Sequence, residues 1–490
     1  MLVFIAFAFL VLTCVWLRRP KRPARFPPGP PMFLVFGNLS ASVELLKGNF
    51  ISLMEVSRRQ FGDIVGFIPP AGKSVVHLFN FDDIKDACGK HEFAGRMDSF
   101  LSLLRSYHQQ LGIVFSQGPA WVEHRRFALR HLKDLGFGKQ STESIVIDEF
   151  EELAKDMIRD SGSPMKVNCR FNLTVLNVLW RLVADKRLDS HDPHAQTYVD
   201  TVNEFFEVVN PRNPLHLAPW LRYIAPEWSG YNAVIRHRSL TTGMFKELVR
   251  EHQRTLDRSS PRDFIDLFLL EMEASDAEGR QFTEQNLAII GMDLFIAGME
   301  TTSTSLSWAL LFMVLHPEVQ GRVQREIDAV LGGRHPAYAD RKAMPYTEAT
   351  LMEVTRRATV LPFSVGHCAV RDADLAGYTI PKGTVLMMHL NAVHMDAAYW
   401  GDPHVFRPER FLQPDGSVRR DERLIPFGVG RRICLGETLA RMEMFVLFTC
   451  LLQRFSFVAA PGQKLSLDSR VSSVQQPMEF FVTYQVRDGQ

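Results

Sequence analysis

A long helical stretch between Gln285 and His316 limits the possible folds more than any other part of the sequence. Its pattern of apolar residues predicts one uninterrupted helix, which Pro317 ends because the residue before a proline avoids the helical conformation. At 1.5 Å per residue this helix is roughly 48 Å long, well above the mean for globular proteins. A helix so long and so apolar has to run through the middle of a domain, so we predict that the other elements pack around it.

The remainder of the chain predicts one large, mainly α-helical domain with small β-sheets. Short β-like runs such as 75–79 lie among turn residues in 33–100, and helical periodicity dominates from about 120 to 360. Residues 360–430 are irregular, and a last helix at about 437–453 precedes a β-like tail. No Gly/Ser-rich linker divides these zones. Prolines interrupt the helical zone at Pro211, Pro214, Pro219 and Pro226.

The composition excludes several classes of protein. With 46% hydrophobic and 23% charged residues, the chain is an ordinary globular protein and is neither disordered nor repetitive. A net charge of +1 argues against a nucleic-acid partner, which needs an excess of basic residues. Without a C-x-x-C pair, a disulfide framework or a cysteine-type zinc site is disfavoured, so any important cysteine acts alone in a reducing compartment. The six cysteines are Cys14, Cys88, Cys169, Cys368, Cys434 and Cys450.

The N-terminus predicts a membrane anchor. Residues 1–17 contain one weakly polar residue, Thr13, and as a helix they are about 26 Å long, the short end of what crosses a bilayer. A cleaved signal peptide is the alternative, but no basic residue precedes the apolar run and no small-residue cleavage site follows it. The basic residues of 18–31 predict that the downstream chain stays in the cytosol. The prolines of the same segment predict a stiff spacer before a globular domain at 32–490.

The loop Phe427–Gly436, with the sequence FGVGRRICLG, is the strongest chemical signal in the chain. Its glycines permit positive φ and a close approach of the backbone to something flat. Arg431 and Arg432 add positive charge, and Cys434 precedes a helix start, where amide donors and the helix dipole favour a thiolate. A lone cysteine near a helix start is often just a small buried hydrophobe, but a thiolate in a glycine-containing loop suits an iron ligand.

This loop resembles the haem-binding signature of the cytochromes P450, the haem-thiolate monooxygenases, and the resemblance extends from the N-terminal anchor to the C-terminal tail. It implies the cytochrome P450 fold and the cofactor haem b, iron protoporphyrin IX, in a catalytic domain at 32–490. Cys434 would be the axial ligand of the haem iron. Phe427 and Arg432 would contact the cofactor.

A Glu-x-x-Arg pair is typical of the same family. Glu353 and Arg356 lie at i and i+3 on one helix face, which by itself would indicate only a weak surface contact. The resemblance implies instead a buried pair that Arg410 of the segment PERF completes. This trio would be structural and would hold the cysteine loop in place.

The segment AGMETT in the long helix resembles the oxygen-activating motif of the family. Gly298 would leave room beside bound dioxygen, Thr301 would donate a hydrogen bond to it, and Glu300 would relay protons from solvent. Reduction of dioxygen consumes protons, so an alcohol and an acid are suitable groups. The alternative is a helix kink with a structural threonine. The glycine and the glutamate favour a site, because both residues are costly inside a buried helix.

The two propionates of haem need cationic partners. Trp121 and Arg125 lie at i and i+4 on one helix face and match the family's propionate-binding helix. Arg96, His367 and Arg432 occupy the other propionate-contacting places by motif position, although a lone histidine is often structural.

The proline-rich segment after a basic anchor is typical of the microsomal members. It implies a single-pass anchor in the endoplasmic reticulum membrane and electrons from a membrane-bound NADPH–cytochrome reductase. The remaining partners would be O2 and a lipophilic small molecule.

Candidate docking cations, which otherwise form a solvated face, are Arg125, Arg126, Arg130 and Lys133. Candidate pocket residues, which otherwise belong to the core, are Phe100, Leu104, Phe115, Phe205, Phe206, Phe295, Ala297, Leu361, Phe363, Val365 and Val474.

The segment 112–115, with Trp121 and 130–132, resembles an insect branch of the family that includes hormone-synthesising enzymes. The preferred activity is therefore epoxidation of methyl farnesoate or farnesoic acid in juvenile hormone biosynthesis. Hydroxylation of an ecdysteroid and broad xenobiotic oxidation are the alternatives. Two remoter alternatives are a peroxide-rearranging isomerase and a non-enzymatic haem binder. The presence of Glu300 and Thr301 argues against both.

Overall fold

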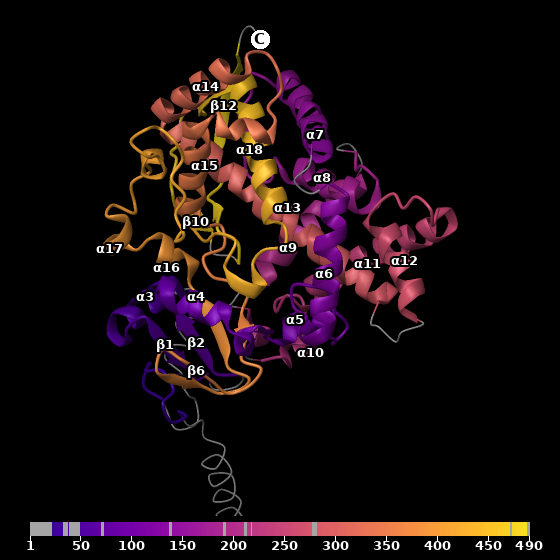
Figure 1. Ribbon diagram of the computed structural model, residues 1–490, viewed down its shortest axis with the longest axis vertical. Helices are drawn as coiled ribbons and strands as arrows, with labels where there is room; N and C mark the ends of the chain where they lie inside the picture. The colour runs from indigo at the N-terminus through magenta and orange to yellow at the C-terminus, as the bar shows by residue number, and fades with distance from the viewer. Residues whose placement is uncertain are drawn as a thin grey trace, which may run out of the picture.

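The computed structural model of the protein describes residues 22–32, 38, 50–69, 73–136, 140–189, 193–209, 213–216, 218–276, 282–470 and 473–487. It is mainly α-helical, with the principal β-sheet at the lower left of Figure 1. The expected fold class is therefore confirmed for the described residues. The proposed anchor at 1–17 lies outside them, and the described residues contain no helix long and apolar enough to span a bilayer.

The predicted central helix is α13 (Glu284–Leu315). The Thr283 side chain caps its start by accepting a hydrogen bond from the Asn286 amide at 3.1 Å, and Pro317 begins the next helix. Close packing depends on small residues of α13, since a Cβ on Gly298 would lie 2.2 Å from Leu179 Cδ1. The helices packed against α13 are α8 (Asn172–Ala184), α11 (Tyr231–Thr255), α14 (Pro317–Leu331), α15 (Pro345–Ala358) and α18 (Glu437–Arg454).

The predicted helical zone between 120 and 360 is confirmed for the described residues. Pro214 begins a 3-10 helix, and Pro219 and Pro226 lie on either side of a short α-helix, whereas Pro211 lies outside the described residues. The other α-helices of the described chain are α3 (Phe50–Phe61), α4 (Phe81–Gly89), α5 (Phe100–Leu104), α6 (Gly118–Asp134), α7 (Gln140–Arg159), α9 (Pro193–Val208), α10 (Leu221–Ile224), α12 (Phe264–Asp276), α16 (Leu390–His394) and α17 (Ala397–Trp400). The 3-10 helices are η1 (His91–Phe93), η2 (Pro214–His216), η3 (Tyr338–Lys342), η4 (Pro408–Phe411) and η5 (Gly430–Arg432).

The principal sheet joins the two ends of the chain. Its strand order is β1 (Ile64–Phe67), β2 (Val75–Leu78), β8 (Val385–Met388), β5 (His367–Cys368) and β3 (Gly95–Arg96). Only the pair β2–β8 is parallel, with Val76 opposite Leu386. The irregular zone expected at 360–430 thus contains strands, which are too short for their alternation to be recognised in the sequence.

Three smaller sheets complete the described structure. One has the order β4 (Met165–Lys166), β12 (Phe481–Val486) and β9 (Phe455–Ala459). The two-stranded sheets are β6 (Ala373–Leu375) with β7 (Tyr378–Ile380), and β10 (Ser469–Arg470) with β11 (Gln476–Pro477). The proline-rich segment packs on the principal sheet, because the Gly66 amide of β1 donates to the Pro28 carbonyl at 2.7 Å and Phe26 is buried.

Candidate active site

A cavity of about 330 Å³ lies inside the protein beside α13 and the cysteine loop. Nine of the residues predicted for the site line this cavity, although they come from five separate segments of the chain. They are Arg96, Trp121, Arg125, Gly298, Thr301, His367, Phe427, Arg432 and Cys434. Four other predicted residues, Glu300, Glu353, Arg356 and Arg410, do not line it.

The cysteine loop holds its shape through two glycines with positive φ, Gly428 (73°) and Gly430 (74°). Gly430 is also required by space, since a Cβ there would lie 2.3 Å from the Cys88 carbonyl oxygen of α4. The Cys434 amide donates to the Phe427 carbonyl at 3.0 Å, and Arg125 donates to the Ile433 carbonyl at 2.6 Å. These bonds fix the loop on both sides.

The Cys434 side chain opens onto the cavity, yet protein surrounds it on its other sides. Burial raises the pKa of this thiol, and the amides of Gly436 and Glu437 at the start of α18 offset that rise only in part. The helix start therefore does not by itself produce a thiolate. A metal cation in the cavity would supply the missing positive charge.

Three buried or half-buried arginines form a cationic wall of the cavity. Arg432 donates to the carbonyls of Ala94 and Ser116 at 2.9 Å and stacks over the Trp121 ring at 3.5 Å. Burial and the neighbouring arginines lower the pKa of Arg432 to about 8, and burial lowers the pKa of Arg96 to about 10. Among the described residues, neither these two arginines nor Arg125 forms an ion pair with a carboxylate.

The hydrogen-bonding capacity of this wall is also incomplete. Arg432 Nη1 and Trp121 Nε1 are buried and have no hydrogen-bond partner in the part of the chain that the structure describes. An anion with several acceptor oxygens would satisfy both the orphaned donors and the uncompensated charge. The two propionates of haem b are such acceptors, and Cys434 on the same cavity is a suitable iron ligand. The residues therefore fit the cofactor.

The predicted oxygen motif on α13 is divided between the cavity and the core. The Thr301 hydroxyl lines the cavity and donates to the Ala297 carbonyl one turn earlier, at 2.7 Å. It has to rotate to donate into the cavity. Glu300 is 1% exposed, and its Oε1 accepts hydrogen bonds from Gln476 and Thr304. Burial raises the pKa of Glu300, and hydrogen bonds from Gln476, Thr304 and Asn172 limit that rise.

The Glu353–Arg356–Arg410 trio lies apart from the cavity and is fully bonded. Arg356 donates to both carboxylate oxygens of Glu353 at 2.8 Å, and Arg410 donates to the same carboxylate at 3.2 Å. Arg356 also donates to the carbonyls of His394 and Pro403 at 2.8 and 2.9 Å. The trio joins α15 to the segment that leads to η4.

Few of the residues predicted for the substrate pocket line this cavity. Of the eleven candidates only Ala297, Leu361 and Val365 line the cavity. Phe295 was wrongly expected there, since it is fully buried and stacks on Trp180 with ring centroids 4.6 Å apart. Because α13 is apolar on nearly all of its faces, the sequence does not show which apolar side chains face the cavity.

Sequence reasoning missed Asp293, a carboxylate on α13 that lines the cavity. It accepts from the amides of Ile113 and Val114 at 2.7 and 2.9 Å and forms a buried ion pair with Arg105. It thereby fixes the loop before α6 over the cavity. A charged residue in a long apolar helix was the available signal.

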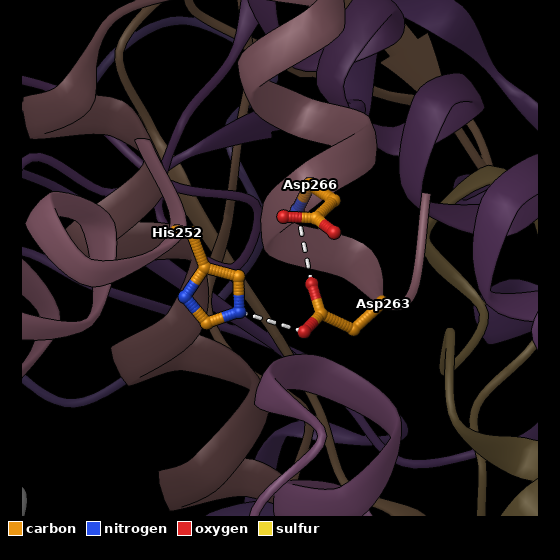
Figure 2. A group of neighbouring side chains, drawn as sticks. All are labelled: His252, Asp263 and Asp266. Carbon is orange, nitrogen blue, oxygen red and sulfur yellow. Dashed lines mark hydrogen bonds and ion pairs between the residues drawn. The ribbon is translucent and has the colours of Figure 1, made fainter. Parts of the chain in front are cut away.

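A second group of titratable residues, shown in Figure 2, lies between α11 and α12. Its three members, His252, Asp263 and Asp266, are close enough to hold a metal ion, but their ligand atoms are already used. His252 binds the Leu248 carbonyl and Asp263, each at 2.7 Å, and Asp266 binds Arg262 at 2.7 and 3.0 Å. The group therefore joins two helices.

Comparison with known proteins agrees with this geometry. A sequence profile of the family described as Cytochrome P450 matches residues 27–484. The chain is 37% identical over 455 residues to cytochrome P450 2L1 of Panulirus argus, with 91% of each chain covered. It is 36% identical over 459 residues to the farnesoate epoxidase of Bombyx mori, which covers 93% of this chain and 92% of the relative. It is 38% identical over 464 residues to cytochrome P450 2D6 of Homo sapiens, with coverages of 93% and 92%.

The matched region contains the whole cavity together with the cysteine loop and the Glu353–Arg356–Arg410 trio. The resemblance and its cofactor are thus confirmed at the level of the family. The chain belongs to the cytochrome P450 family and is a monooxygenase that binds haem b through a cysteine thiolate.

Proposed function

We propose that this cytochrome P450 uses NADPH and O2 to insert one oxygen atom into a lipophilic small molecule, and that methyl farnesoate or farnesoic acid is its preferred substrate. The observation that carries the proposal is the shared cavity of Cys434 and Thr301, whose other walls are largely apolar. Electrons would come from an NADPH–cytochrome reductase docked near the exposed basic residues of α6, namely Arg126, Arg130 and Lys133, whereas Arg125 points into the cavity wall.

Haem, when bound, supplies the reductive activation of dioxygen. Cys434 is the residue proposed to bind the haem iron through its sulfur. Arg96, Arg125, Arg432, Trp121 and His367 are proposed to hold the propionates, with Phe427 and the glycine loop against the ring. These contacts orient the cofactor toward α13.

The groups on α13 are proposed to manage protons. Thr301 would turn its hydroxyl from the Ala297 carbonyl into the cavity to donate a hydrogen bond there, and Glu300 would supply protons from solvent. Gly298 has no Cβ, so the Leu179 side chain can pack directly against α13 and line the cavity beside it. Thr301→Ala is therefore expected to retain haem but to divert NADPH consumption into hydrogen peroxide. Measurement of peroxide per NADPH tests this role, and unchanged coupling would contradict it.

A farnesoid is the first substrate to test. One relative is named for farnesoate epoxidation, and the relatives of similar identity include mammalian enzymes. The cavity walls support an extended apolar molecule, since they include Ile113, Val114, Leu179, Leu294, Ala297, Leu361 and Val365. Burial of such a chain releases roughly 25 cal/mol per Å² of apolar surface.

The protein is proposed to act at the endoplasmic reticulum membrane, held by residues 1–17 and the segment 18–31, with its catalytic domain at 32–490 in the cytosol. A patch of exposed apolar side chains around α10 supports this placement. It consists of Trp220, Tyr223, Ile224 and Trp228, which are 58 to 73% exposed. Such a patch is costly in water and suits the interface of a bilayer.

The test is the mass of the product. Membranes containing the protein and its reductase are incubated with NADPH and methyl farnesoate, in parallel with farnesoic acid, an ecdysteroid and a xenobiotic panel. We expect an NADPH-dependent gain of one oxygen on a farnesoid, which chromatography then locates. If an ecdysteroid or a xenobiotic is oxygenated and no farnesoid is, the proposed substrate is wrong and the oxygenated compound takes its place. Conversion of peroxides without NADPH, or haem binding with no product, would favour the isomerase or the haem binder.

A further inference from the structure

Glu300, the acid proposed for proton delivery, is held by a residue from the far end of the chain. Gln476 of β11 donates through Nε2 to Glu300 Oε1, and Thr304 donates to the same oxygen at 3.2 Å from the next turn of α13. Among the described residues, no hydrogen-bond partner lies within bonding distance of the second carboxyl oxygen, the buried Oε2. The two oxygens of this carboxyl group are therefore in different environments.

The difference decides where a proton can reside. Asn172 lies farther from this carboxyl group, and the two donors at bonding distance, Gln476 and Thr304, both point at Oε1. The carbonyl oxygen of the acid therefore belongs at Oε1, and the O–H belongs on Oε2. We propose that Gln476 is a positioning residue for proton delivery: it fixes Oε1 of Glu300 so that the proton is carried and released by Oε2. This inference rests on the proposed role of Glu300.

The same hydrogen bonds stabilise the carboxylate that remains after Glu300 has given up its proton. When Oε2 gives its proton toward Thr301 and the cavity, the O–H bond breaks and its electron pair remains on the carboxylate. Gln476 and Thr304 then donate to a charged acceptor, which strengthens their hydrogen bonds. The carboxylate regains a proton from the solvent side, where Asn172 lies near Glu300 and donates to Asn203 at 3.2 Å.

Backbone bonds hold the segment that carries Gln476. The neighbouring Gln475 amide donates to the Val360 carbonyl at 2.8 Å, and the Gln475 carbonyl accepts from Trp308 Nε1 at 2.8 Å. Ser473 donates to the Val209 carbonyl after α9. Replacement of the Gln476 side chain therefore leaves the position of the strand unchanged, and Gln475 offers a matched control because its bonds come from the backbone.

The test compares Gln476→Met with Gln475→Met in the haem-loaded enzyme with its reductase. Infrared spectroscopy titrates the protonated carboxyl band of Glu300, which Glu300→Gln identifies by removing it. Loss of the Gln476 donor should raise the pKa of Glu300 by roughly one pH unit, the value of one hydrogen bond to a charged group. The share of NADPH that ends as peroxide should rise several-fold. Gln475→Met should match the wild type in both measurements.

The infrared titration of Glu300 needs a control for Cys169, a neighbouring group that also titrates. Cys169, before α8, interacts electrostatically with Glu300, and burial raises its own pKa to about 11. Lys166, Asp200 and Arg470 act on Cys169 in turn. Cys169→Ser in the wild-type and Gln476→Met backgrounds separates the two titrations. A band midpoint that moves with Cys169→Ser but not with Gln476→Met would overturn the inference.

The measurements distinguish a wrong role for Glu300 from a wrong role for Gln476. If Glu300→Gln leaves the peroxide fraction unchanged, the role of Glu300 is wrong and the inference is lost with it. If Glu300→Gln raises the peroxide fraction while Gln476→Met changes neither the band nor the peroxide, only the role of Gln476 is wrong. If Gln476→Met does not accumulate as folded protein, Thr304→Val replaces it in the test, because this variant removes the other hydrogen-bond donor to Glu300 Oε1. A normal carbonyl spectrum verifies the haem site in each variant.

Discussion

Two groups of buried charges in this protein differ in how completely they are bonded. In the Glu353–Arg356–Arg410 trio, every charge faces an opposite charge and the remaining donors reach backbone carbonyls. In the wall formed by Arg96, Arg125 and Arg432, the cations repel one another and two buried donors have no partner. The first group is complete without a ligand, whereas the second is complete only with one.

The contrast gives a physical way to separate structural residues from binding residues. A buried charge that is fully paired has little to gain from a ligand, and its removal leaves its partner uncompensated. A buried cation without a counter-charge is unfavourable in the empty protein and becomes favourable when an anion binds. Variants in the two groups should therefore fail in different ways.

The largest effect is expected from Cys434→Ala, which removes the thiol from the ligand-dependent group. The protein should lose the thiolate-type carbonyl spectrum completely, because no other described cysteine lines the cavity except Cys88, and that thiol is buried. The reduced carbonyl difference spectrum measures this. Persistence of the thiolate-type band would contradict the ligand assignment.

The next effect is expected from Arg356→Met in the complete group. Removal of this cation leaves Glu353 buried without its main counter-charge, which should cost about 3–5 kcal/mol of unfolding free energy and prevent stable haem incorporation. Arg258→Met, which breaks an exposed pair with Glu273, is the control and should cost about 1 kcal/mol or less. Thermal unfolding of both variants measures the difference. A similar loss of unfolding free energy in the two variants would contradict the structural role of the buried trio.

Arg432→Gln should behave in the opposite manner. Its loss relieves repulsion with Arg96 and Arg125, so the haem-free protein should lose less than about 1 kcal/mol or even gain stability. Haem should dissociate roughly tenfold faster, because a charge-assisted contact is missing. Transfer of haem to an acceptor protein gives the rate. A loss of stability as large as that of Arg356→Met would place Arg432 in the structural group.

The smallest effect concerns His252, which is paired and lies far from the cavity lining. Burial lowers the pKa of His252, but the hydrogen bond and charge of Asp263 outweigh burial, so its pKa is raised in the folded protein. The pair therefore adds stability that is complete below about pH 6.5 and is lost as the pH rises through the raised value.

His252→Gln tests this pH dependence, since glutamine keeps a neutral donor. The difference in Tm between wild type and variant should be on the order of 1 °C at pH 6 and should shrink at pH 8.5. A difference that grows with pH would show that the histidine is neutral in the fold.

Much of the fold could be predicted because its signals are local. The central helix has an apolar sequence bounded by Thr283 and Pro317, and α18 follows a glycine-containing loop, so both were located to within a residue or two. Strands β5 to β8 could not be predicted, because elements of two to four residues show no periodicity. In addition, β5 and β8 pair with strands about 300 residues away, such as β2 for β8.

The cofactor contacts were predicted from motif positions, whereas the contacts between segments were not. Gln476 carries no signal of its partner, because its bond to Glu300 depends on how the C-terminal strands fold back onto α13. Leu179 is one of many apolar residues of α8 and is distinguished only by its contact with Gly298. Pocket residues were least predictable, because an apolar side chain can face the cavity or the core with no change in composition.

The close packing around the cysteine loop has a consequence for how the enzyme is made in the cell. The loop is bonded to α6 by the contact between Arg125 and Ile433, which are 308 residues apart. Gly430 lies directly against α4, so the wall closes only after the C-terminal part is synthesised. At 5–20 residues per second that part follows roughly 15–60 seconds later. Until then the early segments lack the part of the site that carries Cys434, so we expect stable haem binding to follow synthesis of the C-terminal part.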